Sequence, residues 1–266
     1  MKTFKHQLPR IFFSINAFLL AFIFLSFSCN AQPTPKRSLI ALSKGEHVLV
    51  IVDPSTLKTI ARISVGEDPH EVIASSDGKT AFISIYGGGA FHELNVIDLI
   101  NHKPLTNVDT RPLFGPHGIT FVDGKVWFSA EGSKAVGRYD PATAKLDWSM
   151  GTGQDRTHMI YVSEDGQKVY TTNISSGTVS ILLAPESQTA GRHGNWTHAV
   201  VPTAVGSEGF DVSIDGKELW TASSNDGTIS IIDLPTKKIS AKIDAKVFGA
   251  NRLVFTPDGK QVFISS

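Results

Sequence analysis

The chain has 266 residues, of which 41% are hydrophobic and 19% charged, and it carries 25 basic and 25 acidic residues. These values are typical of a globular protein and exclude the strongly basic surface of a nucleic-acid-binding domain, so we expect no nucleic-acid partner. The single cysteine excludes an internal disulfide and a metal site built from several cysteines.

Residues 1–31 have the pattern of an export signal. Lys2, Lys5 and Arg10 precede a mostly apolar run that ends at Phe27. This run is marginal for a membrane span and suits the hydrophobic core of a signal peptide, with a retained anchor helix as the alternative. Removal of the signal leaves 22 basic against 25 acidic residues, which again indicates no polycationic surface.

Cys29 stands where the apolar run ends, and its position resembles the lipid-attachment cysteine of bacterial lipoproteins. Leu25 lies one position too early for that motif, and Phe27 is bulkier than usual. Cleavage after Ala31 by an ordinary signal peptidase is the competing prediction, with lipid attachment favoured. Both predict an extracytoplasmic protein, in the periplasm or at the outer membrane or cell surface. Residues 32–37 then form a short tether, and the membrane is contacted only through the lipid.

Residues 38–266 are predicted to form one all-β domain built from a repeat. Asp-Gly pairs recur 42 to 50 residues apart, at Asp77-Gly78, Asp123-Gly124, Asp165-Gly166, Asp215-Gly216 and Asp258-Gly259. A period of this length, with short alternating runs on both sides of a turn, is typical of the four-stranded blades of a β-propeller. Asp-Gly favours a hairpin turn in which both residues take positive φ.

The runs before the first pair resemble a blade without its innermost strand. They are Ser38–Leu42, His47–Val52 and Thr59–Val65. A propeller commonly completes such a blade with a strand from the other terminus, so we expect a C-terminal segment to close the ring. In the first full blade the expected strands are His70–Ser75, Thr80–Ile85 and Leu94–Asp98. Asp53, Asp140 and Asp233 follow third strands and are predicted to cap turns rather than to act in catalysis.

Alignment of the repeats on their Asp-Gly pairs exposes a column of aromatic residues. Its members are Phe82, Phe128, Tyr170, Trp220 and Phe263. A position that is aromatic in every blade predicts packing between neighbouring blades, where truncation to alanine costs ~3–5 kcal/mol.

A second column, which is polar but variable, opens the innermost strands six or seven residues before each Asp. Its members are His70, His117, His158, Glu208 and Asn251. Equivalent positions of a propeller lie at one height around the central channel, so we expect these side chains to converge on a ligand at the channel mouth. Neutral imidazoles beside a carboxylate suit zinc or another first-row metal, which makes His70, His117, His158 and Glu208 the candidate metal ligands. The alternative is that the histidines only tie loops together, as in WD40-type repeats.

Three further segments border this column or interrupt the repeat. Arg156 and Arg252 lie beside the column and are predicted to bind an anionic group of a ligand or to pair with a neighbouring acid. The Tyr86–Glu93 loop carries three glycines on the same face, so we expect it at the rim of the pocket. Residues 184–198 are an insertion on the opposite face.

Familiar catalytic motifs do not occur in the sequence. His70-Glu71 and His92-Glu93 lack the second histidine of a zinc protease. There is no Gly-x-Ser-x-Gly elbow and no Cys-x-x-Cys-His haem motif. The sequence therefore favours a binding protein over an enzyme.

Several phrases together resemble one family. Tyr170-Thr-Thr-Asn173, Ser176–Ile181, Asp226–Asp233, Pro69-His70, Pro116-His117-Gly118 and Thr256–Lys260 make the chain similar to the YVTN-repeat, YncE-like β-propellers over about 39–266. The resemblance implies a seven-bladed extracytoplasmic propeller that acts as a binding or surface protein. It also implies likeness in fold to lactonases and streptogramin lyases, and Pro116–Ile119 and Val126–Gly132 are closest to the lyases.

The chain stops at Ser266, within the second strand of a blade. We therefore expect four complete blades, over about 66–248, and two partial ones, so that the domain is C-terminally incomplete at about five blades.

The predicted function is that of an exported binding or scaffold module, which holds a small molecule or a protein through the channel mouth. A divalent transition metal is the one cofactor that the residues suggest. The alternative is a metal-assisted lyase or lactone hydrolase that uses the histidines, and a third option is a purely structural surface protein without a site.

Overall fold

The computed structural model describes residues 36–185 and 196–266. Two short 3₁₀ turns are present in this part, η1 (Gly87–Gly89) and η2 (Glu131–Ser133), and the remaining regular elements are strands. None of the described segments is a helix that could cross a membrane. The predicted signal peptide, Cys29 and most of the tether lie outside the described residues.

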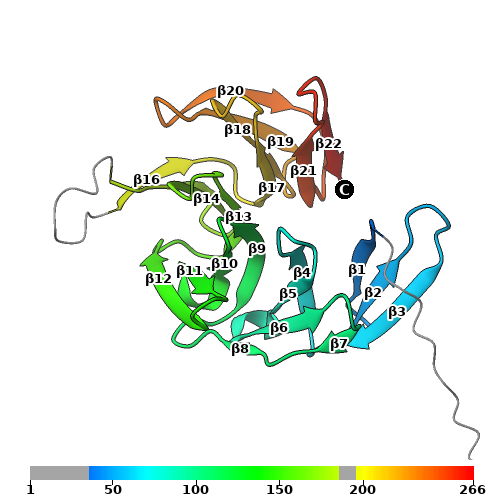
Figure 1. Cartoon of the computed structure of the whole chain (residues 1–266). Helices are drawn as coiled ribbons and strands as arrows, with labels where there is room; N and C mark the ends of the chain where they lie inside the picture. The colour runs from blue at the N-terminus through cyan, green and yellow to red at the C-terminus, as the bar shows by residue number, and fades with distance from the viewer. Residues whose placement is uncertain (1–35, 186–195) are drawn as a thin grey trace, which may run out of the picture. The chain divides into compact units, whose positions relative to one another are not determined.

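The strands form a three-stranded sheet followed by four full blades and a two-stranded sheet (Figure 1). The first sheet contains β1 (Leu39–Ser43), β2 (Val48–Val52) and β3 (Thr59–Ser64). The second contains β4 (Pro69–Ala74), β5 (Thr80–Ile85) and β6 (Glu93–Asp98), with β7 (Lys103–Pro104) and β8 (Val108–Asp109) both paired to β6.

The next blades have four consecutive antiparallel strands each. They comprise β9 (Pro116–Val122), β10 (Lys125–Ala130), β11 (Ala135–Asp140) and β12 (Lys145–Gly151); β13 (Thr157–Val162), β14 (Lys168–Asn173), β15 (Thr178–Leu183) and β16 (Thr197–Pro202); β17 (Ser207–Val212), β18 (Glu218–Ser223), β19 (Thr228–Asp233) and β20 (Lys238–Asp244). The last sheet contains β21 (Arg252–Phe255) and β22 (Val262–Ser265). The first strands β4, β9, β13, β17 and β21 contact one another in succession.

This architecture is a β-propeller, as the repeat predicted, and the predicted strands agree with the observed ones to within one residue. In the part of the chain that the structure describes, the three-stranded sheet has no innermost strand, because Asp53 directly after β2 corresponds to Asp140 and Asp233, which end the third strands of their blades. In the described residues β21 pairs with β22, so neither completes the first sheet. The turn-capping role of Asp53 is confirmed, since its carboxylate accepts hydrogen bonds from Ser55 N at 2.8 Å and Thr56 Oγ1 at 2.9 Å.

The Asp-Gly turns are of two kinds, which corrects the expectation of positive φ at both residues. Only in Asp123-Gly124 do both residues have positive φ, at 49° and 72°, and this pair forms a two-residue hairpin loop. In the other four turns the glycine alone has positive φ. The aspartate instead accepts hydrogen bonds, as Asp77 does from Ser75 Oγ at 2.7 Å and Lys79 N at 3.1 Å.

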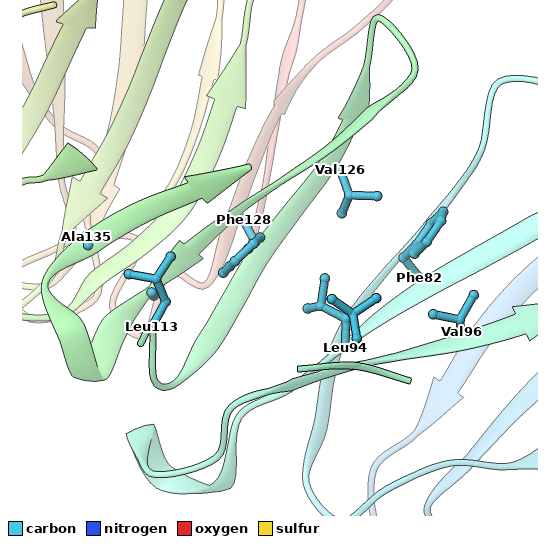
Figure 2. Close-up of a cluster of buried hydrophobic side chains, with 9 residues drawn as sticks. Phe82, Leu94, Val96, Leu113, Val126, Phe128 and Ala135 are labelled. Carbon is cyan, nitrogen blue, oxygen red and sulfur yellow. The ribbon is translucent and has the colours of Figure 1, made fainter. Parts of the chain in front are cut away.

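The shorter turn at Asp123 shifts one blade of the aromatic column by one residue. Trp127 of β10 packs against the following blade, β13–β16. Phe128 faces the preceding blade and lies in the cluster that contains Phe82, as Figure 2 shows. Because side chains alternate between the faces of a strand, an offset of one residue along the strand exchanges their partners. The structural equivalent of Phe82 is therefore Trp127, and Phe128 buries the opposite face.

Packing between blades is confirmed for the other members of the column except Phe263. Phe82 stacks on Phe121 of the next blade with ring centroids 6.0 Å apart, and Trp220 meets Phe255 edge-on at 5.6 Å. Phe263 is 61% exposed, since no strand of a following sheet covers it among the described residues. The prediction of inter-blade packing is wrong at this position.

Candidate functional site

The structure brings the polar column together as one continuous row. The ring centroids of His70 and His117 lie 4.3 Å apart, and those of His117 and His158 lie 3.8 Å apart. His158 Nε2 is 3.5 Å from Glu208 Oε1, and Asn251 Nδ2 donates a hydrogen bond to the same oxygen. Each of the five predicted positions therefore contacts the next one along the row.

Hydroxyl groups of the second strands fix the backbone of this row. Ser84 Oγ donates to His117 O at 2.6 Å, Ser129 Oγ donates to His158 O, and Thr172 Oγ1 donates to Glu208 O at 2.7 Å. Each bond joins one blade to the next. Serine and threonine thus supply one tie between neighbouring blades at each of these three positions.

A left-handed residue two positions before each column member turns the chain into its innermost strand. These residues are Asp68, Gly115, Arg156, Gly206 and Gly249. A non-glycine residue costs about 1 kcal/mol in this conformation. Asp68 and Arg156 are therefore placed against backbone preference, and both side chains contact the row: Asp68 Oδ1 lies 3.4 Å from His70 Nδ1, and Arg156 reaches Glu131 beside His158.

Replacing Arg156 with glycine is expected to leave the protein more stable than replacing it with alanine, by about 1 kcal/mol, because only glycine relieves the positive φ. Both variants lose the same side-chain contacts, so their difference isolates the backbone term. Urea unfolding of the two variants measures it. Equal stabilities would show that the backbone at residue 156 is not strained.

Glu131 is a site residue that the column analysis missed. It lies in η2, after the second strand of its blade, and is 7% exposed. Its carboxylate accepts hydrogen bonds from Tyr86 Oη at 2.8 Å, Arg156 Nε at 2.8 Å and His158 Nδ1 at 3.0 Å. The available signal was the Val126–Gly132 phrase, which contains Glu131 and was singled out for its likeness to the lyases.

Three glycines let the Tyr86 loop and the Glu131 turn meet. A Cβ on Gly132 would lie 2.1 Å from Gly89 O, and one on Gly115 would lie 2.7 Å from Gly89 Cα. The backbones therefore touch directly, which places Tyr86 beside the row: its ring centroid is 4.7 Å from that of His70 and 5.1 Å from that of His117. The glycine-rich loop thus contributes Tyr86 to the site, whereas His92 of the same loop pairs with Asp109 instead.

Three imidazole nitrogens are buried without a hydrogen-bond partner among the described residues, and one of them, His198 Nε2 of β16, lies outside the row. The two in the row are His117 Nδ1 and His158 Nε2, and these residues are 2% and 3% exposed. The 3.5 Å from His158 Nε2 to Glu208 Oε1 is too long for a normal hydrogen bond. Buried polar atoms are normally paired, so these two nitrogens are available to a ligand or an ordered water.

The electrostatics of the two buried histidines differ. Burial, followed by the positive charges of neighbouring groups, holds the pKa of His117 well below its usual range, so this ring is neutral. Burial also opposes charge on His158, but the hydrogen bond to Glu131 and the negative charges of Glu131 and Glu208 outweigh it and raise the pKa of His158. For Glu131, burial is outweighed by the hydrogen bonds from His158, Arg156 and Tyr86, and its pKa is about 2. Glu131 is therefore ionised.

His117, Glu131 and His158 form a group that could hold a small divalent cation. One donor atom from each of His117, Glu131 and His158 lies within 4.8 Å of the other two. The 3.5 Å between His158 Nε2 and Glu208 Oε1 matches the separation of about 3.3–3.6 Å between two ligands of a tetrahedral zinc ion. Because His158 Nδ1 is hydrogen-bonded to Glu131, its Nε2 is the free donor, in the carboxylate–histidine arrangement common behind metal ligands.

The ends of the row are occupied by ion pairs. Lys44 Nζ lies 2.7 Å from Asp68 Oδ1 and 3.1 Å from His70 Nε2. His70 is thus engaged from the side opposite His117, which makes it a less available ligand than the sequence suggested. At the other end Arg252 contacts Glu208 at 3.3 Å and also pairs with Glu71. Both predicted arginines, Arg156 and Arg252, therefore pair with neighbouring acids.

No family model and no curated protein matches the sequence. Known structures are similar in fold. Hydrazine synthase of Kuenenia stuttgartiensis superposes with a TM-score of 0.70 at 17% sequence identity, covering 86% of this chain and 77% of that one. A functionally unknown protein of Desulfotomaculum acetoxidans DSM 771 gives a TM-score of 0.65 at 17% identity, covering 86% and 75%. At this identity the likeness concerns the β-propeller fold alone.

Proposed function

We propose that this propeller is an exported binding module that holds its ligand through a divalent transition metal in the polar row. The observation that carries the proposal is the pair of buried, unpartnered nitrogens on His117 and His158, beside two carboxylates. His117 and His158 would hold the metal together with a carboxylate, Glu208 at 3.5 Å from His158 or Glu131, which also orients His158. Few protein ligands leave coordination positions for a small molecule or a protein side chain.

The balance of charge supports a cation here. Once His158 has lost its proton, as metal binding requires, the carboxylates that line the row outnumber its permanently charged cations. The acids are Asp68, Glu71, Glu131 and Glu208, and the cations are Lys44, Arg156 and Arg252. A bound metal would offset the excess negative charge.

Elemental analysis of the full chain, purified without chelator, tests the proposal. We expect about one zinc or other first-row ion per chain, lost on dialysis against chelator and regained on addition of the metal. A preparation that holds no metal and takes up none from micromolar zinc would contradict it.

Metal binding should release about one proton, from His158, because His117 is already neutral and the lowered pKa values of Glu208 and Glu131 keep both carboxylates ionised. His158 has a raised pKa, so its proton competes with the metal up to a pH above its ordinary value of about 6.5. Affinity is therefore expected to fall about tenfold per pH unit below that pKa and to level off above it. Calorimetry in buffers of different ionisation enthalpy measures the proton count. Release of two or more protons would show that His117 is charged in the free protein.

A second candidate is a metal-assisted lyase or lactone hydrolase. It is favoured by Glu131, which lies inside the phrase most similar to the lyases and directly hydrogen-bonds His158. A panel of lactones and cyclic esters separates the two candidates. Turnover by the metal-loaded chain that is lost in Glu131→Gln would support the enzyme, and an inactive but metal-binding chain would support the binding module.

Export and lipid attachment at Cys29 complete the proposal. The support is the charged and apolar pattern that precedes the lone cysteine. Intact-mass analysis of protein extracted from membranes is expected to show a diacylglyceryl-modified Cys29 as the first residue. An unmodified N-terminus at Gln32 would indicate ordinary cleavage after Ala31.

A further inference from the structure

Arg252 links two carboxylates that come from well-separated parts of the chain. Its Nη2 pairs with Glu71 Oε1 of β4, and its Nη1 lies 3.3 Å from Glu208 Oε1 of β17. The same Nη1 donates to Asn251 O and Oδ1, each at 3.0 Å. A planar guanidinium can satisfy several acceptors at once, which a lysine ammonium cannot do in this geometry.

The oxygen that Arg252 contacts is also the one that faces the unpartnered nitrogen. Glu208 Oε1 lies 3.5 Å from His158 Nε2, accepts a hydrogen bond from Asn251 Nδ2 and lies 3.3 Å from Arg252 Nη1. A metal bound between His158 and Glu208 would therefore share this oxygen with a permanent cation. Two cations on one carboxylate oxygen oppose each other.

We propose that Arg252 is an internal cation that competes with the metal for Glu208, and that Glu71 holds its guanidinium partly away. This inference rests on the proposed function, and it assigns Arg252 and Glu71 as residues that set metal affinity without being ligands. Neither side chain is deeply buried, since they are 38% and 24% exposed. The guanidinium therefore has room to move between the two acids.

The proposal predicts opposite effects for two substitutions. Arg252→Met removes the competing charge and is expected to tighten metal binding on the order of 10-fold, as for the loss of one partly exposed charge beside a site. Glu71→Gln removes the acid that restrains Arg252, so the guanidinium turns fully to Glu208, and binding is expected to weaken by a similar factor. A purely structural ion pair would make both variants change in the same direction.

The experiment titrates Co²⁺ and Zn²⁺ into the chelator-treated full chain, with calorimetry for affinity and the visible spectrum of Co²⁺ for ligand geometry. Arg138→Met serves as the matched control, because Arg138 forms a comparable pair with Asp147 at 2.7 Å on outer strands of another blade. It is expected to bind as the wild type does. Arg252→Gln is measured beside Arg252→Met. If one of them does not fold, the metal affinity of the other still tests the competition.

The outcomes separate this inference from the proposed function. Tighter binding by Arg252→Met with weaker binding by Glu71→Gln supports it. If the wild type binds metal and both variants bind it equally well, the inference is overturned and the metal site stands. Weaker binding by Arg252→Met has the same consequence. Binding by Arg252→Met alone supports the competition and shows that the wild-type arginine blocks the site. No binding by any protein overturns both.

Discussion

Replacing Phe128 with alanine is expected to lower the free energy of unfolding by ~3–5 kcal/mol, the largest effect of any single substitution proposed for this chain. Phe128 is fully buried in the cluster between the second and third sheets, where it faces Phe82 and Leu94 (Figure 2). Its ring fills the space beside Gly137, where a Cβ would lie 2.5 Å from Phe128 Cζ. Removal of the ring therefore leaves a cavity that the rigid strands cannot close.

Phe263→Ala is the matched control for Phe128→Ala. Both phenylalanines follow an Asp-Gly pair by five residues, but Phe263 is 61% exposed. Its truncation is expected to change stability by less than about 0.5 kcal/mol, as for most surface substitutions. Urea unfolding of both variants measures the contrast. Similar losses would show that Phe263 is buried in solution, and a small loss for Phe128 would contradict the packing between the blades.

Replacing His117 with alanine is expected to weaken metal binding by at least ~100-fold, because a neutral, preformed donor nitrogen is lost. Stability should change by only about 1 kcal/mol. Loss of the ring contacts with His70 and His158 opposes the gain from removing a buried nitrogen that has no partner. The small change in stability does not come from exposure of the side chain, because His117 is 2% exposed and is therefore buried.

His92→Ala is the control for His117→Ala. His92 pairs with Asp109 outside the row, and its side chain is 41% exposed. It should bind metal as the wild type does. Metal titration and thermal melting of both variants decide between the two roles for His117. A loss of stability as large as that of Phe128→Ala, with metal binding retained, would assign His117 to holding the blades together.

Much of the fold could be predicted from the sequence because its signals are local. Strands such as Thr80–Ile85 follow from alternation over a few residues, and the Asp-Gly pairs mark hairpins by backbone preference alone. The period then places equivalent residues at equivalent heights, which is why the sequence predicted that His70, His117 and His158 would converge. The aspartates of the corners, such as Asp53, cap turns through contacts within three residues.

Only the tertiary structure decided the features that depend on which blade faces which. Glu131 joins His158 from a turn outside the column, and its role follows from the contact of the Tyr86 loop with that turn, between glycines distant in sequence. A hairpin loop two residues shorter, by one residue on each strand, exchanged the partners of Trp127 and Phe128, because alternation on a strand converts a small change of length into a change of face. Likewise Arg252 meets Glu71 across 181 residues, where no local pattern connects them. Charge pairing at such range is set by the arrangement of the blades and not by neighbouring residues.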